Sequence, residues 1–297
     1  MSISARVTPL ARAVLIALGG ILTLTVMDAV AKQLVTGDLN LIQVMALRSL
    51  FVVMAFLLLI RLRSAPHKIL PTRWRPQLLR AAVGIIAPLG FFASLRYLPL
   101  TNATVIAYNS VFVTSILSAL ILKERVGPWR WAAIAVGYIG VAVALEPTGA
   151  GSTIGYTLVL VASVSYSALA ISGKWMGDTE SSSSLVLTYN SMLGLVCLAL
   201  LPWFWQTMSL ASVAMVALFA MMAVAGQLML TEAYRRLDGS LVAPLEYTSL
   251  VWAVLLDVMI WSTTPTVRTL GGATIIILAS LLVLHRERLN ARLHTRR

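Results

Sequence analysis

Hydrophobic residues occur along this chain in long runs separated by short polar connections. Most runs lack the alternation of apolar and polar positions that is typical of a half-buried strand, and each approaches the ~20 residues that a helix needs to cross ~30 Å of hydrocarbon. Because backbone polar groups in lipid must be satisfied within the segment, we predict helices. The ten predicted spans lie near residues 11–32, 41–60, 78–97, 101–122, 128–146, 154–175, 184–205, 209–232, 240–261 and 267–285.

The composition supports the same fold class. Hydrophobic residues make up 59% of the 297 residues and charged residues 11%, and the mean hydropathy is +0.88. A soluble domain carries about a quarter charged residues and under half apolar ones. We therefore predict an all-α polytopic membrane protein with no room for a soluble catalytic or nucleotide-binding domain. The single cysteine, Cys197, excludes an intrachain disulfide framework and a thiolate metal site.

The net charge of +12 is distributed unevenly over the predicted loops. If both termini are cytoplasmic, 19 Lys and Arg residues lie on the cytoplasmic side and three outside (Lys32, Arg96 and Arg268), with Arg48 inside a span. Cytoplasmic loops of membrane proteins carry such an excess of Lys and Arg. The charge thus predicts a multi-pass protein of the cytoplasmic (inner) membrane with cytoplasmic N- and C-termini, and it does not indicate nucleic-acid binding.

The chain also contains an internal repeat. A shift of 139 residues lays 94–98 over 233–237 and pairs Tyr108 with Tyr247, and a shift of 142 pairs Arg48 with Asn190. Predicted helices one to five therefore repeat as six to ten, and a repeat of five spans places its second copy upside down in the bilayer. Transporters built from inverted repeats bind substrate near the midplane between the halves. We expect repeats at residues 1–147 and 148–297, together forming one membrane domain.

Several motifs resemble a known family. Residues 94–103 read Ser-Leu-Arg-Tyr-Leu-Pro-Leu-Thr-Asn-Ala, residues 122–125 read Leu-Lys-Glu-Arg with Pro-Trp at 128–129, and 240–244 read Ser-Leu-Val-Ala-Pro. With these motifs the chain resembles the EamA family of the drug/metabolite transporter (DMT) superfamily over essentially its whole length, and within it the YddG-type amino-acid exporters. It departs from the family at 262–264, where Ser-Thr-Thr replaces the usual Gly-Glu.

The resemblance implies a secondary transporter that exports small metabolites, with aromatic or other apolar amino acids as the expected substrates, by alternating access. A multidrug or lipophilic-cation exporter on the same fold is the alternative. Phosphate-loop, nucleophile-elbow and His-Glu-x-x-His motifs are absent from the sequence, so we predict neither an enzyme nor a cofactor or metal. The expected partners are a small-molecule substrate, the lipid bilayer and, if transport is coupled to them, protons.

Five ionisable residues lie inside predicted spans: Asp28, Lys32, Arg48, Glu246 and Asp257. Such a group costs about 2.5–3.5 kcal/mol at a helix centre, so it normally faces a polar interior. Asp28 and Lys32 are four residues apart and are predicted to pair, unless Asp28 binds a substrate amine or a proton. Arg48 fits either an interhelical lock to Asp28 or to backbone carbonyls, or a clamp for a substrate carboxylate. Asp257 is expected to be solvated near the outer boundary.

Residues near the middle of the fourth and ninth predicted helices are expected to face a shared centre. The predicted substrate-binding residues are Asp28, Arg48, Tyr108, Asn109, Asn190, Glu246, Tyr247 and Trp252. Helix breakers at matched positions of two spans, Pro88 with Gly90 and Gly226, predict bent helices that gate the site. Local packing of small residues explains these three positions equally well.

Overall fold

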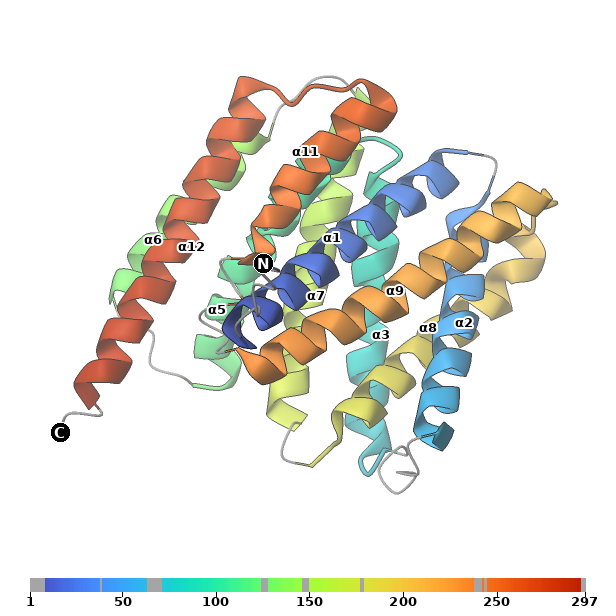
Figure 1. Cartoon of the computed structure of the whole chain (residues 1–297), viewed down its shortest axis with the longest axis horizontal. Helices are drawn as coiled ribbons and strands as arrows, with labels where there is room; N and C mark the ends of the chain where they lie inside the picture. Colours follow the sequence, from blue (N-terminus) through green and yellow to red (C-terminus); the bar gives the residue numbers. More distant parts are fainter. Residues whose placement is uncertain are drawn as a thin grey trace, which may run out of the picture.

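The computed structural model describes residues 9–37, 39–62, 71–123, 128–145, 150–176, 179–237, 242 and 245–294. All regular secondary structure in these ranges is helical, and consecutive helices run back and forth through a single bundle (Figure 1). The helices are α1(Pro9–Thr36), α2(Leu41–Leu62), α3(Trp74–Ser94), α4(Leu100–Ala107), α5(Asn109–Ile121), α6(Pro128–Ala144), α7(Ala150–Met176), α8(Ser182–Phe204), α9(Leu210–Arg236), α11(Thr248–Trp261) and α12(Val267–His294).

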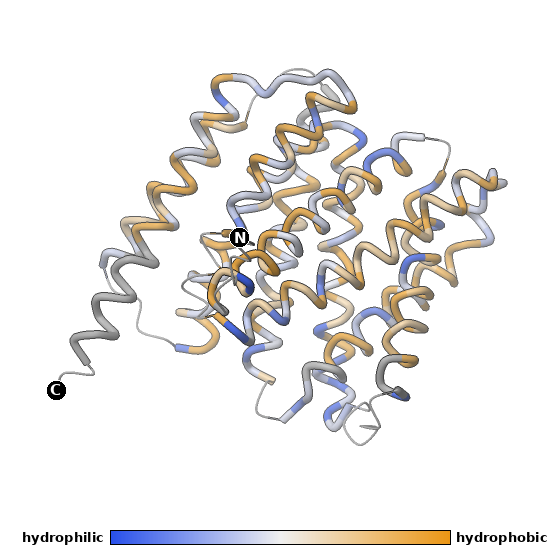
Figure 2. The backbone as a smooth tube through the Cα atoms, viewed as in Figure 1, coloured by the Kyte–Doolittle hydropathy of each residue, from blue (hydrophilic) through white to orange (hydrophobic). Residues whose placement is uncertain are grey.

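The helices have the length and composition of membrane spans. Within the described ranges, seven segments are long and apolar enough to cross a bilayer, and three shorter apolar helices lie at Trp131–Ala144, Thr248–Trp261 and Val267–Leu282. Apolar positions dominate the helices, and many polar positions lie near the helix ends (Figure 2). The chain is a multi-pass membrane protein, as predicted. The first part of the predicted span 240–261 lies largely outside the described residues.

Helices from the first half of the chain pack on helices from the second half. The most extensive contacts are those of α1 with α9, α3 with α7, α2 with α8 and α6 with α12. Helices α4 and α5 contact α7, while α11 contacts α1 and α4. The core of the bundle is therefore the interface between residues before 145 and residues after 150.

Glycines allow two of these helix pairs to approach closely. A Cβ atom at Gly90 of α3 would lie 2.9 Å from the carbonyl oxygen of Leu158 in α7, and one at Gly226 of α9 would lie 2.8 Å from the side chain of Leu24 in α1. Helices α3 and α9 continue through both glycines, and α3 also continues through Pro88. These positions thus serve packing, and a gating role for them stays a prediction.

The helix breaks lie elsewhere, at two tyrosines that correspond under the shift of 139 residues. Tyr108 separates α4 from α5 with φ −63° and ψ −12°, and Tyr247 precedes α11 with φ −66° and ψ −14°. The carbonyl of Tyr108 accepts the N–H of Val111 at 3.0 Å, and that of Tyr247 accepts the N–H of Leu250 at 3.1 Å. The predicted span 101–122 is therefore divided into two helices with a junction inside the bundle.

Helix connections gather at two opposite ends of the bundle. We call the end formed by residues 37, 39–40, 95–99, 205–209 and 262–266 the Trp261 end. The other end, formed by residues 71–73, 122–123 and 179–181, is the Glu180 end. In Figure 1 the connection between α11 and α12 lies at the top and the connection between α7 and α8 at the bottom.

Candidate functional site

A buried ion pair holds three helices together at the Trp261 end. Lys32 Nζ in α1 lies 2.9 Å from Asp257 Oδ1 in α11, and their side chains are 8% and 1% exposed. The Asp257 carboxylate also accepts the N–H groups of Leu100 at 3.0 Å and Thr101 at 2.7 Å, at the start of α4. A helix N-terminus stabilises an anion because its first N–H groups have no partner within the helix.

This arrangement corrects two predictions. The predicted pairing of Lys32 with Asp28 is wrong, because the ammonium of Lys32 reaches across to α11. The predicted interfacial solvation of Asp257 is also wrong, because an ammonium and two backbone N–H groups replace water around the carboxylate. The spacing of four residues correctly places Asp28 and Lys32 on one helix face, but the ion-pair partner of Lys32 is Asp257, 225 residues away.

Further contacts tie the same end. The indole ring of Trp261 lies over Lys32, with Nζ 4.0 Å from its centroid, which allows a cation–π interaction. Arg96 donates from Nε to the carbonyl oxygen of Val35 at 2.5 Å and from an Nη to that of Leu39 at 3.1 Å. The side chain of Gln43 exchanges two hydrogen bonds with the backbone of residue 206, at 2.9 and 3.1 Å.

A carboxylate that the sequence analysis did not single out organises the Glu180 end. Glu180 accepts the N–H of Arg73 at 2.6 Å and that of Thr72 at 3.2 Å. Desolvation raises the pKa of Glu180, but these two hydrogen bonds, with contributions from Gln77 and Ser184, outweigh it and hold the pKa below its ordinary value. Its sequence signal is the position of an acidic residue directly before the serines that begin α8.

Two opposite charges lie between the ends without pairing directly. Asp28 in α1 and Arg48 in α2 are half-buried and interact electrostatically. No ion pair joins Asp28 to another described residue. The guanidinium of Arg48 lies 5.5 Å from the ring centroid of Phe219, and its Nε is buried with no hydrogen-bond partner in the described chain. The predicted equivalent of Arg48, Asn190, donates to the carbonyl of Val186 in its own helix.

The two helix breaks bring the predicted central residues into contact. The hydroxyl of Tyr108 lies 2.7 Å from the carbonyl oxygen of Glu246 and 2.7 Å from Ser249 Oγ. The rings of Tyr108 and Tyr247 are 5.0 Å apart between centroids. The carboxylate of Glu246 accepts a hydrogen bond of 2.6 Å from the hydroxyl of Tyr234. A polar cluster thus joins the middle of the fourth span to the ninth.

Side chains from neighbouring helices extend this cluster. Tyr166 in α7 and Tyr234 in α9 are 58% and 45% exposed, and both interact electrostatically with Glu246. Asn109 donates to Ser163 Oγ at 2.8 Å, while its Oδ1 is buried with no partner in the described chain. Trp252 is half-buried, and its Nε1 also lacks a hydrogen-bond partner there.

Sequence reasoning missed two members of the central region. Tyr234 binds Glu246, and Phe219 lies beneath Arg48 and packs edge-to-face on Phe92, with the ring centroids 5.5 Å apart. Tyr234 falls within the repeated segment 233–237, so the repeat itself carried a signal for it. Phe219 lies in an ordinary apolar run and had no such signal.

A membrane bundle with unpaired charges and a polar cluster in its interior has the features of a transporter. The profile of the EamA-like transporter family matches the chain twice, at residues 11–145 and 153–285. The chain belongs to this family, and so to the drug/metabolite transporter superfamily. The predicted family is confirmed.

Several relatives are transporters of small molecules. The S-adenosylmethionine uptake transporter of Rickettsia felis is 28% identical over 190 residues, which cover 64% of this chain and 65% of that protein. The riboflavin transporter of Rhizobium johnstonii is 27% identical, covering 73% and 71%. The pseudopaline exporter of Pseudomonas aeruginosa is 24% identical, covering 90% and 94%. The match therefore spans less than two thirds of the length of the Rickettsia relative.

A solved crystal structure supports the fold alone. It matches with a TM-score of 0.65 and 17% sequence identity, covering 91% of this chain and 96% of that one.

Proposed function

We propose that this protein is a secondary transporter that exports small metabolites carrying an amino-acid group, by alternating access. In this proposal ten spans form two inverted repeats, residues 1–147 and 148–297. The two family matches support it, and so do the equivalent breaks at Tyr108 and Tyr247. The packing supports it as well, because an exchange of the repeats converts the pair α1 and α9 into the pair α7 and α3.

The proposed orientation places the Trp261 end outside a bacterial-type cytoplasmic membrane, with both termini in the cytoplasm. The excess of Lys and Arg in the loops of the opposite end supports this orientation. In the proposed state the ion pair of Lys32 and Asp257 keeps the outer end closed. In this proposal the polar cluster, beside which the exposed rings of Tyr166 and Tyr234 lie, is reached from the cytoplasm.

The observation that carries the substrate assignment is the separated charge pair of Asp28 and Arg48. Charges within membrane spans normally pair with each other or bind a ligand. Here the Arg48 Nε is buried without a hydrogen-bond partner in the described residues, and Asp28 makes no ion pair with them. A zwitterionic amino acid supplies both missing partners, its amine for Asp28 and its carboxylate for Arg48, since a guanidinium binds a carboxylate through two parallel N–H groups.

The remaining predicted residues complete the proposed site. The ring of Phe219 beside Arg48 and the indole of Trp252 would contact an apolar substrate side chain. Glu246 is the proposed second carboxylate for an amine, or for a proton if transport is coupled. Polar contacts would come from Tyr108, Asn109, Asn190 and Tyr247. S-adenosylmethionine, the compound for which the Rickettsia relative is named, itself carries an amino-acid group.

The test is efflux of labelled phenylalanine from proteoliposomes that contain purified protein. We expect Asp28→Asn and Arg48→Lys each to lower the rate at least about tenfold, because each loses a charge-assisted contact worth ~1.5–3 kcal/mol. Arg61→Gln is the matched control, since Arg61 is an exposed arginine near the end of the same helix as Arg48. Wild-type rates in Arg48→Lys would refute the assignment, and efflux of ethidium without phenylalanine would favour the multidrug alternative.

A further inference from the structure

We propose that the pocket at the Trp261 end is a second binding site, which takes the carboxylate of an apolar organic acid through Lys32 and Arg96. This inference rests on the proposed function in two respects, the outward orientation of the Trp261 end and the carboxylate of the substrate. In transport the pocket would hold the substrate as it passes the outer mouth.

The pocket has the size and charge for such a ligand. Its volume is about 360 Å³, within the range of small-molecule sites. Lys32 and Arg96 line it together with Tyr97 and Trp261, and no acidic residue is among the described residues of its lining. Asp257 is not part of the lining although it binds Lys32, so the counter-charge of Lys32 lies behind it.

Both cations keep donors for a ligand. The ammonium of Lys32 has three N–H groups, and Asp257 is its only hydrogen-bond acceptor in the described chain, while the indole of Trp261 covers another side of it. Arg96 uses Nε and one Nη to bind the carbonyl oxygens of Val35 and Leu39, which fixes the plane of its guanidinium. The other Nη makes no hydrogen bond to a described residue. The guanidinium of Arg96, which lines the pocket beside Lys32, is therefore fixed in place and still has donors for a ligand.

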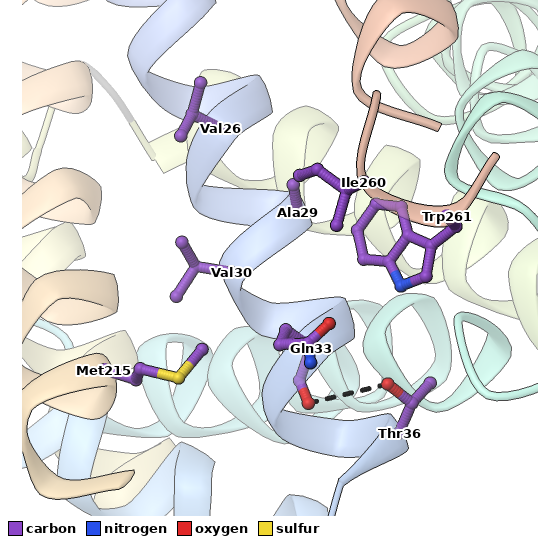
Figure 3. Close-up of a pocket in the computed structure, with 8 residues that line it drawn as sticks. All are labelled: Val26, Ala29, Val30, Gln33, Thr36, Met215, Ile260 and Trp261. Atoms are coloured by element: carbon purple, nitrogen blue, oxygen red, sulfur yellow. Dashed lines mark hydrogen bonds between the residues drawn. The ribbon is translucent and has the colours of Figure 1, made fainter. Parts of the chain in front are cut away.

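An adjacent groove accounts for the apolar part of the ligand. A second cavity of about 500 Å³ between α1, α9 and α11 shares Thr36 and Trp261 with the pocket. Figure 3 shows its apolar wall of Val26, Val30 and Met215, with Thr36 at one end and the indole of Trp261 beside it. A carboxylate bound at Lys32 could therefore extend an apolar group past Trp261 into this groove.

Occupancy of the pocket bears directly on the outer ion pair. A ligand carboxylate at Lys32 competes with Asp257 for the same ammonium. Asp257 also binds the N–H groups of Leu100 and Thr101, so a weaker pair loosens the attachment of α1 to both α11 and α4. Helix α4 is only eight residues long and ends at the Tyr108 break, so the contact with Asp257 lies about two turns from that break.

A cysteine at the pocket tests binding without depending on transport. Tyr97 lines the pocket and is 44% exposed, whereas the native Cys197 is buried, so a membrane-impermeant maleimide should label Tyr97→Cys selectively. We expect 3-phenylpropionate, added outside intact cells, to slow labelling in a saturable manner, and phenethylamine, which lacks the carboxylate, not to slow it. In the Tyr97→Cys background, Arg96→Gln should raise the half-protecting concentration about tenfold, as expected for a lost charge-assisted hydrogen bond.

Two further variants serve as controls. Arg268→Gln removes another exposed arginine at the same end that does not line the pocket, and it should leave protection unchanged. Arg96→Lys keeps the charge and should retain most of the protection, which covers the case in which Arg96→Gln fails to fold. Equal protection by phenethylamine, unchanged protection in Arg96→Gln, or labelling only from the cytoplasmic side would overturn the proposal.

The same assay separates this proposal from the proposed function. Arg48→Lys in the Tyr97→Cys background should lose phenylalanine efflux and keep protection by 3-phenylpropionate. Absent efflux in the wild-type protein together with intact protection would reject the amino-acid transport function and leave the outer site standing. Intact efflux with no protection would reject the outer site alone.

Discussion

The two ends of the bundle are held by different kinds of interaction. At the Trp261 end a buried ion pair links α1 to α11 and, through two backbone N–H groups, to α4. In the proposed repeat Lys32 corresponds to Lys174 and Asp257 to Ser118, so the equivalent place at the Glu180 end cannot form the same ion pair. Among the described residues, the buried ion pair at the Trp261 end thus has no counterpart between these two positions.

The difference matters because burial changes what an ion pair contributes. Removing one partner of a buried ion pair strongly destabilises the folded protein, whereas an exposed ion pair contributes little to its stability. Lys32 and Asp257 are almost fully buried, whereas the pair of Arg236 with Glu232 near the Glu180 end is 44% and 35% exposed and lies within one helix. The ion pair of Lys32 with Asp257 is therefore the contact at the Trp261 end whose loss should destabilise the protein most.

The largest expected effect follows from breaking this pair. Asp257→Asn should destabilise the protein by about 3–5 kcal/mol, because it leaves the Lys32 ammonium buried without a counter-charge. The measurement is the thermal unfolding midpoint of the purified protein in detergent. Replacing both residues, with Lys32→Met and Asp257→Leu, should recover part of the loss, since no unpaired charge remains. A wild-type midpoint in Asp257→Asn would show that the pair does not hold this end.

The Glu180 end should instead show a dependence on pH. The pKa of Glu180 lies below its ordinary value, so the ionised carboxylate stabilises the folded protein above about pH 4.3, and this stability is lost as the pH falls through the lowered pKa. Glu180→Gln should lower stability at pH 7 by ~1.5–3 kcal/mol, the contribution of hydrogen bonds to a charged group.

Unfolding midpoints of wild type and Glu180→Gln between pH 7 and pH 3.5 test this expectation. The difference in unfolding midpoint between wild type and Glu180→Gln should be constant down to about pH 4.3. It should decrease below that pH, because protonated Glu180 resembles glutamine. A difference in unfolding midpoint that stays constant to pH 3.5 would contradict the assigned role of the carboxylate.

These contacts also mark where sequence reasoning succeeded and where it could not. Apolar runs predicted the spans because lipid leaves the backbone few alternatives to a helix. The predicted repeat placed Tyr108 and Glu246 near a shared centre, and the hydroxyl of Tyr108 does contact the backbone of Glu246. The breaks at Tyr108 and Tyr247 had no Gly or Pro at the break itself, so local propensity gave no indication of them.

Partner choice was the harder problem. Lys32 has an acidic residue on its own helix face and another 225 residues away, and only the packing of α1 against α11 decides between them. Glu180 was missed for a related reason, since its acceptor role depends on backbone N–H groups that a side-chain motif does not encode. Spacing along one element identifies possible contacts, whereas tertiary structure selects among them.

The smallest expected effect compares two glutamines at corresponding helix ends. Gln43 at the Trp261 end donates to the carbonyl of residue 206 and accepts its N–H, while Gln77 at the Glu180 end donates to Ser184 Oγ at 3.0 Å. The Oε1 of Gln77 is buried with no partner in the described chain. Gln43→Leu leaves two backbone groups unpaired and should cost about 1–2 kcal/mol. Gln77→Leu loses the hydrogen bond to Ser184 and the contribution of Gln77 to Glu180, but it also removes an unsatisfied oxygen, so it should cost about 1 kcal/mol or less.

Unfolding midpoints of the two variants, measured side by side, decide whether the asymmetry extends beyond the ion pair. A larger loss in Gln43→Leu would mean that neutral contacts also favour closure of the Trp261 end. Equal decreases in midpoint would limit the difference between the two ends to the ion pair of Lys32 and Asp257. A larger decrease in Gln77→Leu would mean that neutral contacts stabilise the Glu180 end more than the Trp261 end. Both side chains are buried glutamines near the start of a helix, so the two substitutions differ mainly in the polar groups that lose a hydrogen-bond partner.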